Sequence, residues 1–288
     1  MRIVVTGAGG MLGRALSRVL ASAEVECLPY PSSALDVTDR RAVEEALRSE
    51  RPDWVVHAAA FTRVDDCEAE PDRAMAVNAE GTLHVAEAAA AVEARVVYVS
   101  TDYVFDGRKG TPYTEEDEPA PLSVYGKSKL GGERVLQKTL PDGHWVIVRT
   151  AWMYGEGGRN FVDRIMERSE AGQQLTVVDD QVGTPTWTVV VAWAIQVIVK
   201  AQLAGIYHVV SGGAASWFEV AEEILRLTGA DVPLRPTTTA ALGLPARRPG
   251  YSVLDTTKLQ RDTGIVPEAW QGALAAYLAE RRLVAEPN

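Results

Sequence analysis

Cysteine is scarce in this chain, whose 288 residues include only Cys27 and Cys67. Two cysteines form neither a disulfide framework nor a four-thiolate zinc site, so the sequence predicts a protein of a reducing compartment, the cytoplasm. Long apolar runs are missing as well. The longest, Val189–Val199, contains Gln196, whereas a membrane helix needs about 20 apolar residues. Glycines interrupt the apolar start of the chain, so no signal peptide is expected there.

Basic residues are a minority among the charged ones. The chain has 29 lysines and arginines against 39 acidic residues, a formal net charge of −10. Such a chain repels phosphate backbones at long range, which argues against general nucleic-acid binding but allows a local basic pocket for one phosphorylated ligand. Hydrophobic residues make up 47% and charged residues 24%. This composition predicts a folded globular protein rather than a disordered or coiled-coil chain.

Short apolar segments alternate with helical patterns along the first two thirds of the chain. The predicted strands are residues 3–5, 25–28, 54–57, 95–99, 146–148 and 206–210, and the predicted helices are residues 11–20, 39–50, 73–92, 125–137 and 189–201. The strands are nearly all apolar, which indicates a parallel sheet covered on both faces rather than a sandwich or barrel. The predicted fold class is therefore α/β, a Rossmann-type doubly wound parallel sheet.

Three glycines with the spacing G-x-x-G-x-x-G lie between the first predicted strand and the first predicted helix. They are Gly7, Gly10 and Gly13. Glycine permits the positive φ of a tight turn, and a missing side chain lets backbone N–H groups approach a pyrophosphate at the helix N-terminus. The pattern alone is weak, but its position between strand and helix is the context that dinucleotide binding requires. The alternative is a tight turn without a ligand.

The end of the second predicted strand bears on the choice between NADH and NADPH. An acid there would bind the ribose 2′-hydroxyl, and an arginine would favour a 2′-phosphate. The strand ends in neither, and the hydroxyls of Ser32 and Ser33 tolerate a 2′-phosphate. Asp36 is a candidate contact to the adenine, with a helix cap or turn as the alternative. The sequence leaves both cofactors open.

A tyrosine and a lysine, Tyr125 and Lys129, are four residues apart at the start of a predicted helix, so they share one helical face. A tyrosine with a pKa of about 10 transfers protons poorly at neutral pH. A cation beside it favours the phenolate and lowers that pKa. Thr101, which follows the fourth predicted strand, can donate to a substrate carbonyl oxygen. The alternative is a surface tyrosine–lysine pair and a structural threonine.

With these motifs the sequence resembles the extended short-chain dehydrogenase/reductases, and among them the dTDP-4-dehydrorhamnose reductases. The resemblance covers nearly the whole chain, and its most specific string is STDYVFDG at residues 100–107. The other matching stretches are AAAFTRVD at 58–65, AVN at 76–78, YGKSKLGGE at 125–133, RTAWMYG at 149–155, NFV at 160–162, DQVGTPT at 180–186 and GIYH at 205–208.

The resemblance implies reduction at C4 of a dTDP-4-keto-6-deoxy-L-sugar to dTDP-L-rhamnose, with hydride from NADPH or NADH and a proton from Tyr125. The implied catalytic residues are Thr101, Tyr125 and Lys129. Residues implied to contact the cofactor are Gly7, Gly10, Met11, Leu12, Gly13, Asp36, Val37, Ala59, Ala60, Tyr125 and Lys129. Residues implied to contact the substrate are Thr62, Val64, Thr101, Asp102, Tyr103, Tyr125 and Trp152.

Glycines and prolines become frequent after residue 150, which predicts a smaller C-terminal substrate-binding lobe. We assign residues 1–150 and about 188–210 to the dinucleotide-binding domain, and about 151–187 and 211–288 to the lobe. A diphosphate needs positive charge, and within the lobe Arg247–Arg248 is the best candidate, with Arg248 as a substrate contact. The alternative is a solvated arginine pair.

No residue spacing typical of a metal site occurs, so no metal ligand is predicted. The acidic run Glu115–Glu118 lacks the spacing of a calcium loop and is predicted to be a solvated turn. Some relatives place a magnesium ion between subunits with acidic residues of the first helix. Here that helix contains Arg14–Arg18 without an acid, so the use of magnesium stays open.

Two other functions remain open. An epimerase or dehydratase acting on nucleotide sugars would use the same fold, but a dehydratase often has Asp-Glu directly after the strand-end threonine, and Asp102–Tyr103 stand here. A non-catalytic regulatory subunit need not keep the Thr101, Tyr125 and Lys129 set. The expected partners are a nucleotide sugar and a second copy in a homodimer, with neither nucleic acid nor membrane.

Overall fold

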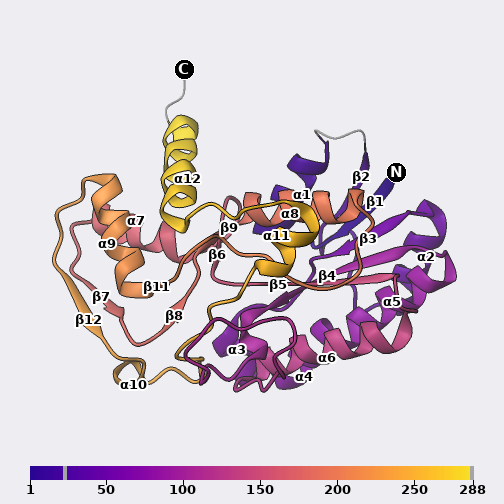
Figure 1. Cartoon of the computed structure of the whole chain (residues 1–288), viewed down its shortest axis with the longest axis horizontal. Helices are drawn as coiled ribbons and strands as arrows, with labels where there is room; N and C mark the ends of the chain where they lie inside the picture. The colour runs from indigo at the N-terminus through magenta and orange to yellow at the C-terminus, as the bar shows by residue number, and fades with distance from the viewer. Residues whose placement is uncertain (22–24, 286–288) are drawn as a thin grey trace.

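A parallel sheet of six strands, in the order β2-β1-β3-β4-β5-β10, forms the larger part of the molecule (Figure 1). The computed structural model describes residues 1–21 and 25–285. The strands are β1 (Arg2–Thr6), β2 (Glu26–Tyr30), β3 (Trp54–His57), β4 (Arg95–Thr101), β5 (Trp145–Thr150) and β10 (Gly205–His208). Because β1 connects to β2 on one side while the chain then crosses to β3 on the other, the sheet is doubly wound. The predicted fold class is confirmed.

Helices cover both faces of the sheet because successive strand side chains point to opposite faces. Ile3 and Val5 of β1 pack in the core beneath α1 (Met11–Ala21) and α8 (Thr188–Lys200). Val4 between them packs in the opposite core. That core contains the helices α2 (Arg40–Glu50), α5 (Gly81–Ala91) and α6 (Val124–Thr139). The apolar strands therefore serve two cores at once, which explains their unbroken hydrophobicity.

The long helix predicted over residues 73–92 is wrong in detail. The chain forms α3 (Val64–Ala69), α4 (Pro71–Met75), a π-helical turn (Ala76–Glu80) and then α5. Within the wide turn the buried Asn78 amide accepts from Phe61 N at 2.8 Å, and its Nδ2 donates to Phe61 O at 3.0 Å and to Ser128 Oγ at 2.9 Å. Asn78 therefore fastens the segment after β3 to helix α6.

A smaller C-terminal region lies beside the sheet, on the left of Figure 1. Its elements are β6 (Met153–Tyr154), α7 (Phe161–Glu170), β7 (Leu175–Val178), β8 (Val182–Gly183), β9 (Thr186–Trp187), β11 (Ala215–Ser216), α9 (Trp217–Thr228), β12 (Leu234–Thr237), α10 (Thr239–Leu242) and α12 (Trp270–Ala285). The short helix α11 (Thr257–Thr263) instead contributes Leu259 to the core of the sheet. The exact domain boundaries stay a prediction. No helix within the described residues is both long and apolar enough to cross a bilayer.

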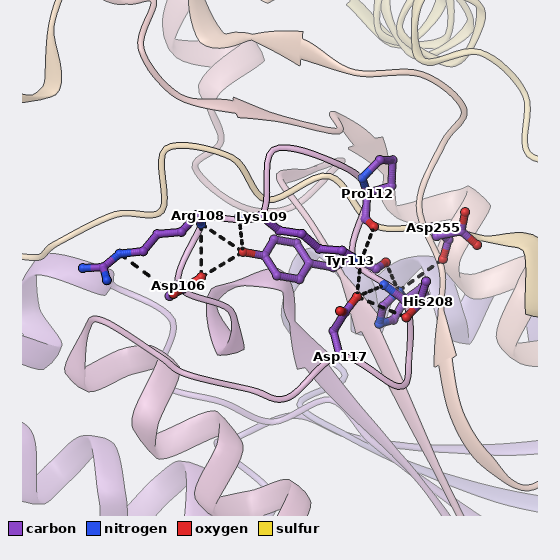
Figure 2. A network of polar contacts seen from close by, with 9 residues as sticks. Asp106, Arg108, Lys109, Pro112, Tyr113, Asp117, His208 and Asp255 are labelled. Carbon is purple, nitrogen blue, oxygen red and sulfur yellow. Dashed lines mark hydrogen bonds and ion pairs between the residues drawn. The ribbon is translucent and has the colours of Figure 1, made fainter.

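The loop after β4 is fixed to the C-terminal region by the network in Figure 2. Tyr113 donates from its hydroxyl to Asp106 Oδ1 at 2.9 Å, and its backbone N–H donates to Val253 O at 2.8 Å. The prediction that Glu115–Glu118 form a solvated turn is partly wrong. Glu115 is half-buried, and its Oε1 accepts a hydrogen bond from His208 N at 3.0 Å. This network attaches the loop and the 251–255 segment to β10.

Candidate active site

The carboxyl ends of the parallel strands meet at one edge of the sheet, and a cavity of about 910 Å³ opens there. Its sheet side is formed by residues that follow or end β1, β3, β4 and β5, among them Gly7, Ala59, Thr101 and Ala151. The reversal of strand order beside β1 is where doubly wound folds bind ligands. The volume suits a small-molecule site.

The three loop glycines differ in how much room their surroundings leave for a side chain. A Cβ on Gly7, whose φ is +68°, would stand 2.6 Å from Ala59 N, and a Cβ on Gly13 would stand 2.2 Å from Gly7 O. The fold itself therefore requires glycine at these two positions. Among the described residues, a Cβ on Gly10 would meet only Gly7 O, at 3.4 Å, and Gly10 lines the cavity at the start of α1. Gly10 is thus the position that leaves room for a ligand, and the helix N-terminus favours a pyrophosphate.

Ser32, Asp36 and Thr38, which follow β2, also line the cavity. Asp36 Oδ1 accepts from Thr38 N at 2.9 Å and from Thr38 Oγ1 at 2.8 Å, and these hydrogen bonds lower the pKa of Asp36. The cap of α2 is Asp39, not Asp36. Asp36 therefore both shapes a turn and faces the cavity, and no cationic side chain stands among these three.

Thr101 and Tyr125 meet at the cavity wall, where β4 ends and α6 begins. Thr101 Oγ1 donates to Asp102 Oδ1 at 3.0 Å and accepts from Tyr103 N at 3.2 Å. Burial raises the pKa of Tyr125 well above its ordinary value, and a hydrogen bond with Thr101 partly opposes this. Tyr125 therefore holds its proton at neutral pH, in the form that a proton donor needs.

Lys129 lies behind this wall and is not a cavity-lining residue. Its buried Nζ stands 4.0 Å from the centre of the Tyr98 ring. Burial lowers the pKa of Lys129 to about 7, and the charge of Glu133 opposes the shift. The pKa of Tyr125 is raised, with burial as the largest cause, and Lys129 is not one of the causes of the shift. The predicted lowering of the Tyr125 pKa by Lys129 is therefore wrong.

A buried ion pair fixes α6 to the sheet. Glu133 on α6 accepts from Arg149 Nε at 3.0 Å and Nη2 at 2.7 Å, and from Ser100 Oγ at 2.5 Å. Both charged side chains are 2% exposed. Because Ser100 precedes Thr101 and α6 carries Tyr125, this cluster sets the distance between the two cavity-wall residues.

Glu133→Ala is expected to lower the free energy of unfolding by about 3–5 kcal/mol, because it leaves the Arg149 charge buried and unpaired. Urea denaturation followed by circular dichroism measures the loss. The control is Glu44→Ala, which removes the exposed helical pair with Arg40 and should leave stability close to that of the unmodified protein. Equal losses in the two variants would contradict a structural role for the buried pair.

Two stacked indoles also line the cavity. Trp152 and Trp217 both line the cavity, with ring centroids 3.6 Å apart and planes 4° from parallel. Trp152 has a φ of +45°, and Gly183 packs so closely that a Cβ there would stand 2.4 Å from the indole. Trp152 is therefore held by packing and also presents a surface to the cavity. Thr62, Val64 and Tyr103 join this lining.

Arg248 does not line the cavity. Its guanidinium binds Asp65 in two places, with Nη2 at 2.7 Å from Oδ2 and Nη1 at 3.1 Å from Oδ1. It is neither a freely solvated arginine nor placed on the cavity surface, whereas Arg247 is exposed. All the other residues expected at the site, apart from Lys129, line the cavity.

The sequence reading missed two cationic side chains of the cavity, Arg73 and Arg159, and the aromatic Trp217. Arg73 lies over the Phe61 ring and pairs with Glu70. The sequence does indicate the helix that begins at Trp217, because Ser216 and Glu219 form the capping box that starts α9. Arg159 had no local signal. Within the residues that the structure describes, no group of three acidic, histidine or cysteine side chains is arranged to hold a metal ion.

The glycine loop around Gly10 lies where the strand order reverses, and the Thr101–Tyr125 pair lies next to it. This arrangement is the architecture of the extended short-chain dehydrogenase/reductases. Residues 1–283 match the model of the RmlD substrate binding domain. The chain is 45% identical over 280 residues to a dTDP-4-dehydrorhamnose reductase of Streptomyces griseus, covering 95% of this chain and 91% of that protein. It is 43% identical to a probable dTDP-4,6-dihydroxy-2-methyloxan-3-one 4-ketoreductase of Streptomyces antibioticus, covering 95% and 93%.

Among solved structures, the fold is similar to that of a dTDP-4-dehydrorhamnose reductase of Bacillus anthracis in complex with NADP, with a TM-score of 0.94 and 35% identity. The match covers 97% of this chain and 99% of that one. The chain belongs to the RmlD substrate-binding domain family, a family of NAD(P)-dependent dTDP-sugar 4-ketoreductases.

Proposed function

We propose that this protein reduces the C4 ketone of dTDP-4-dehydro-L-rhamnose to give dTDP-L-rhamnose, with NADPH or NADH as reductant. The observation that carries the proposal is the placement of Thr101 and Tyr125 in the same cavity as the Gly10 cradle. The names of similar proteins support a dTDP-linked 4-ketosugar as substrate. An NADP-bound relative supports the cofactor.

The chemistry assigned to the chain is proton delivery and orientation. When bound, a reduced nicotinamide supplies the hydride. Tyr125 gives its proton to the developing alkoxide at C4, and Thr101 donates a hydrogen bond that holds the ketone oxygen beside it. Lys129 is assigned to the cofactor ribose, which would require its buried Nζ to turn from the Tyr98 ring toward the cavity. The stacked Trp152 and Trp217 give the sugar ring an apolar wall.

The test is cofactor oxidation with a panel of dTDP- and UDP-linked 4-ketosugars, each assayed with NADPH and NADH. The largest kcat/KM is expected for dTDP-4-dehydro-L-rhamnose. A purified protein that retains NAD and interconverts sugar epimers without net oxidation would establish the epimerase alternative. A folded protein that binds cofactor and turns over none of the ketosugars would establish the regulatory subunit.

Arg159 is proposed to bind a phosphate of the ligands. It lines the cavity in the loop before α7, and none of the contacts found in the described residues gives it a carboxylate partner. Its loop lies against the cofactor cradle, because a Cβ on Gly158 would stand 2.5 Å from Met11 Cγ. A guanidinium at this position can neutralise a diphosphate that the acidic chain otherwise repels.

Arg159→Ala is expected to weaken ligand binding about tenfold, with kcat less affected. Titration with NADPH and, separately, the KM for the dTDP-sugar identify which phosphate is bound. Arg164→Ala on α7 is the matched control, because Arg164 is exposed and not part of the cavity. Unchanged affinity for both ligands would contradict the assignment.

The remaining assignments are also proposals. Arg248 is assigned to the substrate diphosphate, which would require it to exchange Asp65 for the ligand. The division into a dinucleotide-binding domain and a substrate-binding lobe, association into a homodimer, the use of magnesium and the cytoplasmic location all stay predictions.

A further inference from the structure

A buried chain of hydrogen bonds joins the C-terminal region to the threonine of the site. Ser252 Oγ donates to Asp102 Oδ2 at 2.5 Å, and Thr101 Oγ1 donates to Asp102 Oδ1 at 3.0 Å. The three residues are 1%, 2% and 6% exposed in that order. Both carboxylate oxygens of Asp102 are therefore engaged inside the protein, although Asp102 lines the cavity.

The fold holds Ser252 in place from both sides. Ser252 N donates to Val182 O at 2.8 Å, and the next carbonyl, that of Val253, accepts from Tyr113 N at 2.8 Å. Figure 2 shows Tyr113 in turn next to His208 and Asp255, whose carbonyl lies 3.2 Å from His208 Nδ1. The backbone around Ser252 is therefore held by hydrogen bonds, which keeps the serine hydroxyl next to Asp102.

The proton count at Thr101 creates a conflict with its proposed role. A threonine hydroxyl has one proton to donate. In the arrangement described, Thr101 gives that proton to the Asp102 carboxylate and accepts from Tyr103 N. Its hydrogen bond with Tyr125 competes for the same proton, so none is left for a ketone oxygen. If Asp102 carries a proton, its own O–H can donate to Thr101 Oγ1. The Thr101 proton is then free to point into the cavity.

We propose that Ser252 is a positioning residue that, through Asp102, sets whether Thr101 donates its proton to the carboxylate or to the substrate ketone. The inference rests on the proposed function, because it concerns the binding of a carbonyl substrate. Ser252 donates to the carboxylate and so stabilises its ionised form, which is the form that occupies the Thr101 proton. The ketone-binding state is the one in which Asp102 is protonated.

The surroundings place this switch near neutral pH. Burial raises the pKa of Asp102 to about 7, and the hydrogen bonds from Ser252 and Thr101 oppose the rise. The charge of Asp102 acts on the phenols of Tyr103 and Tyr125, and the Arg248–Asp65 pair lies beyond Tyr103. The protonated acid dominates below its pKa, so kcat/KM for the ketosugar should be full at lower pH and fall as pH rises through that value.

The test compares pH profiles of kcat/KM for Ser252→Ala, Asp102→Asn and the unmodified protein. Loss of the Ser252 donor raises the pKa of Asp102, so the fall should move to higher pH by about one unit. In Asp102→Asn the amide N–H can donate to Thr101 as the protonated acid does, so this fall should disappear whatever the plateau rate. Ser211→Ala is the matched control, because that buried hydroxyl has no hydrogen-bond partner among the described residues and its loss should leave the profile in place.

Infrared titration of the Asp102 carboxyl, identified by its absence in Asp102→Asn, supplies a readout without substrate. A Ser252→Ala variant that is slower but keeps both the pH profile and the carboxyl pKa would overturn the proposal. If Ser252→Ala does not fold, a pH fall that survives in Asp102→Asn would overturn it. A shifted carboxyl pKa in a protein that reduces no 4-ketosugar would instead count against the proposed function and leave the Ser252–Asp102 link supported.

Discussion

Tyr125→Phe is expected to lower kcat by about 10²–10⁴-fold, because the transferable proton is lost while the ring remains. The ring packs edge-on against Tyr103, with centroids 5.8 Å apart, and is almost fully buried. Its contacts survive the change, so the Kd for NADPH should stay within about twofold of the original. Steady-state turnover and fluorescence titration with NADPH separate the two quantities.

Tyr154→Phe is the matched control for this prediction. Tyr154 is also a buried tyrosine and lies in the core of the C-terminal region. Within the part of the chain that the structure describes, its hydroxyl has no hydrogen-bond partner. Loss of its hydroxyl should leave kcat nearly unchanged. Undiminished turnover in Tyr125→Phe would remove the phenol as proton donor, and a comparable loss in both variants would point to packing rather than proton transfer.

Gly10→Val is expected to raise the Kd for NADPH by about 10- to 100-fold, with kcat measured at saturation less affected. The fold tolerates a Cβ at this position, since Gly7 O, at 3.4 Å, is the only atom of residues 1–21 and 25–285 that it would contact. The branched side chain would instead occupy the cavity at the N-terminus of α1. Fluorescence or calorimetric titration with NADPH measures the change directly.

Gly9→Val supplies the comparison within the same loop. Of the residues that the structure describes, a Cβ on Gly9 would meet only the Pro31 side chain, at 3.4 Å, and Gly9 does not line the cavity. The variant carries the same added bulk and the same loss of chain freedom, so its affinity for NADPH should change little. Equal weakening in both variants would show that loop conformation, rather than space for the ligand, decides binding.

The sequence predicts the sheet and its cavity edge well because both depend on local patterns. Each apolar strand is recognised from a few consecutive residues, and the glycine loop and Thr101 are found directly at the ends of such strands. The hydrogen-bond partner of Asp102 does not follow from a local pattern, because Ser252 comes 150 residues later in the chain. Arg159 is missed for the same reason, since only tertiary packing brings its loop against Met11. Lys129 and Arg248 are the expected basic residues, but burial lowers the pKa of Lys129 to about 7 and Arg248 is paired with Asp65. Neither effect can be inferred from neighbouring positions in the sequence.

The late position of β10 in the chain has a consequence for biosynthesis. Its residues, Gly205–His208, supply the outer hydrogen-bonding neighbour of β5. Until the ribosome has released them, a nascent chain with β1 to β5 already folded exposes the bare edge of β5, which can recruit strands from other chains. The protein should therefore depend most on chaperones while the segment between β5 and β10 is being made. A stalled product ending before residue 205 should aggregate more readily than the full chain.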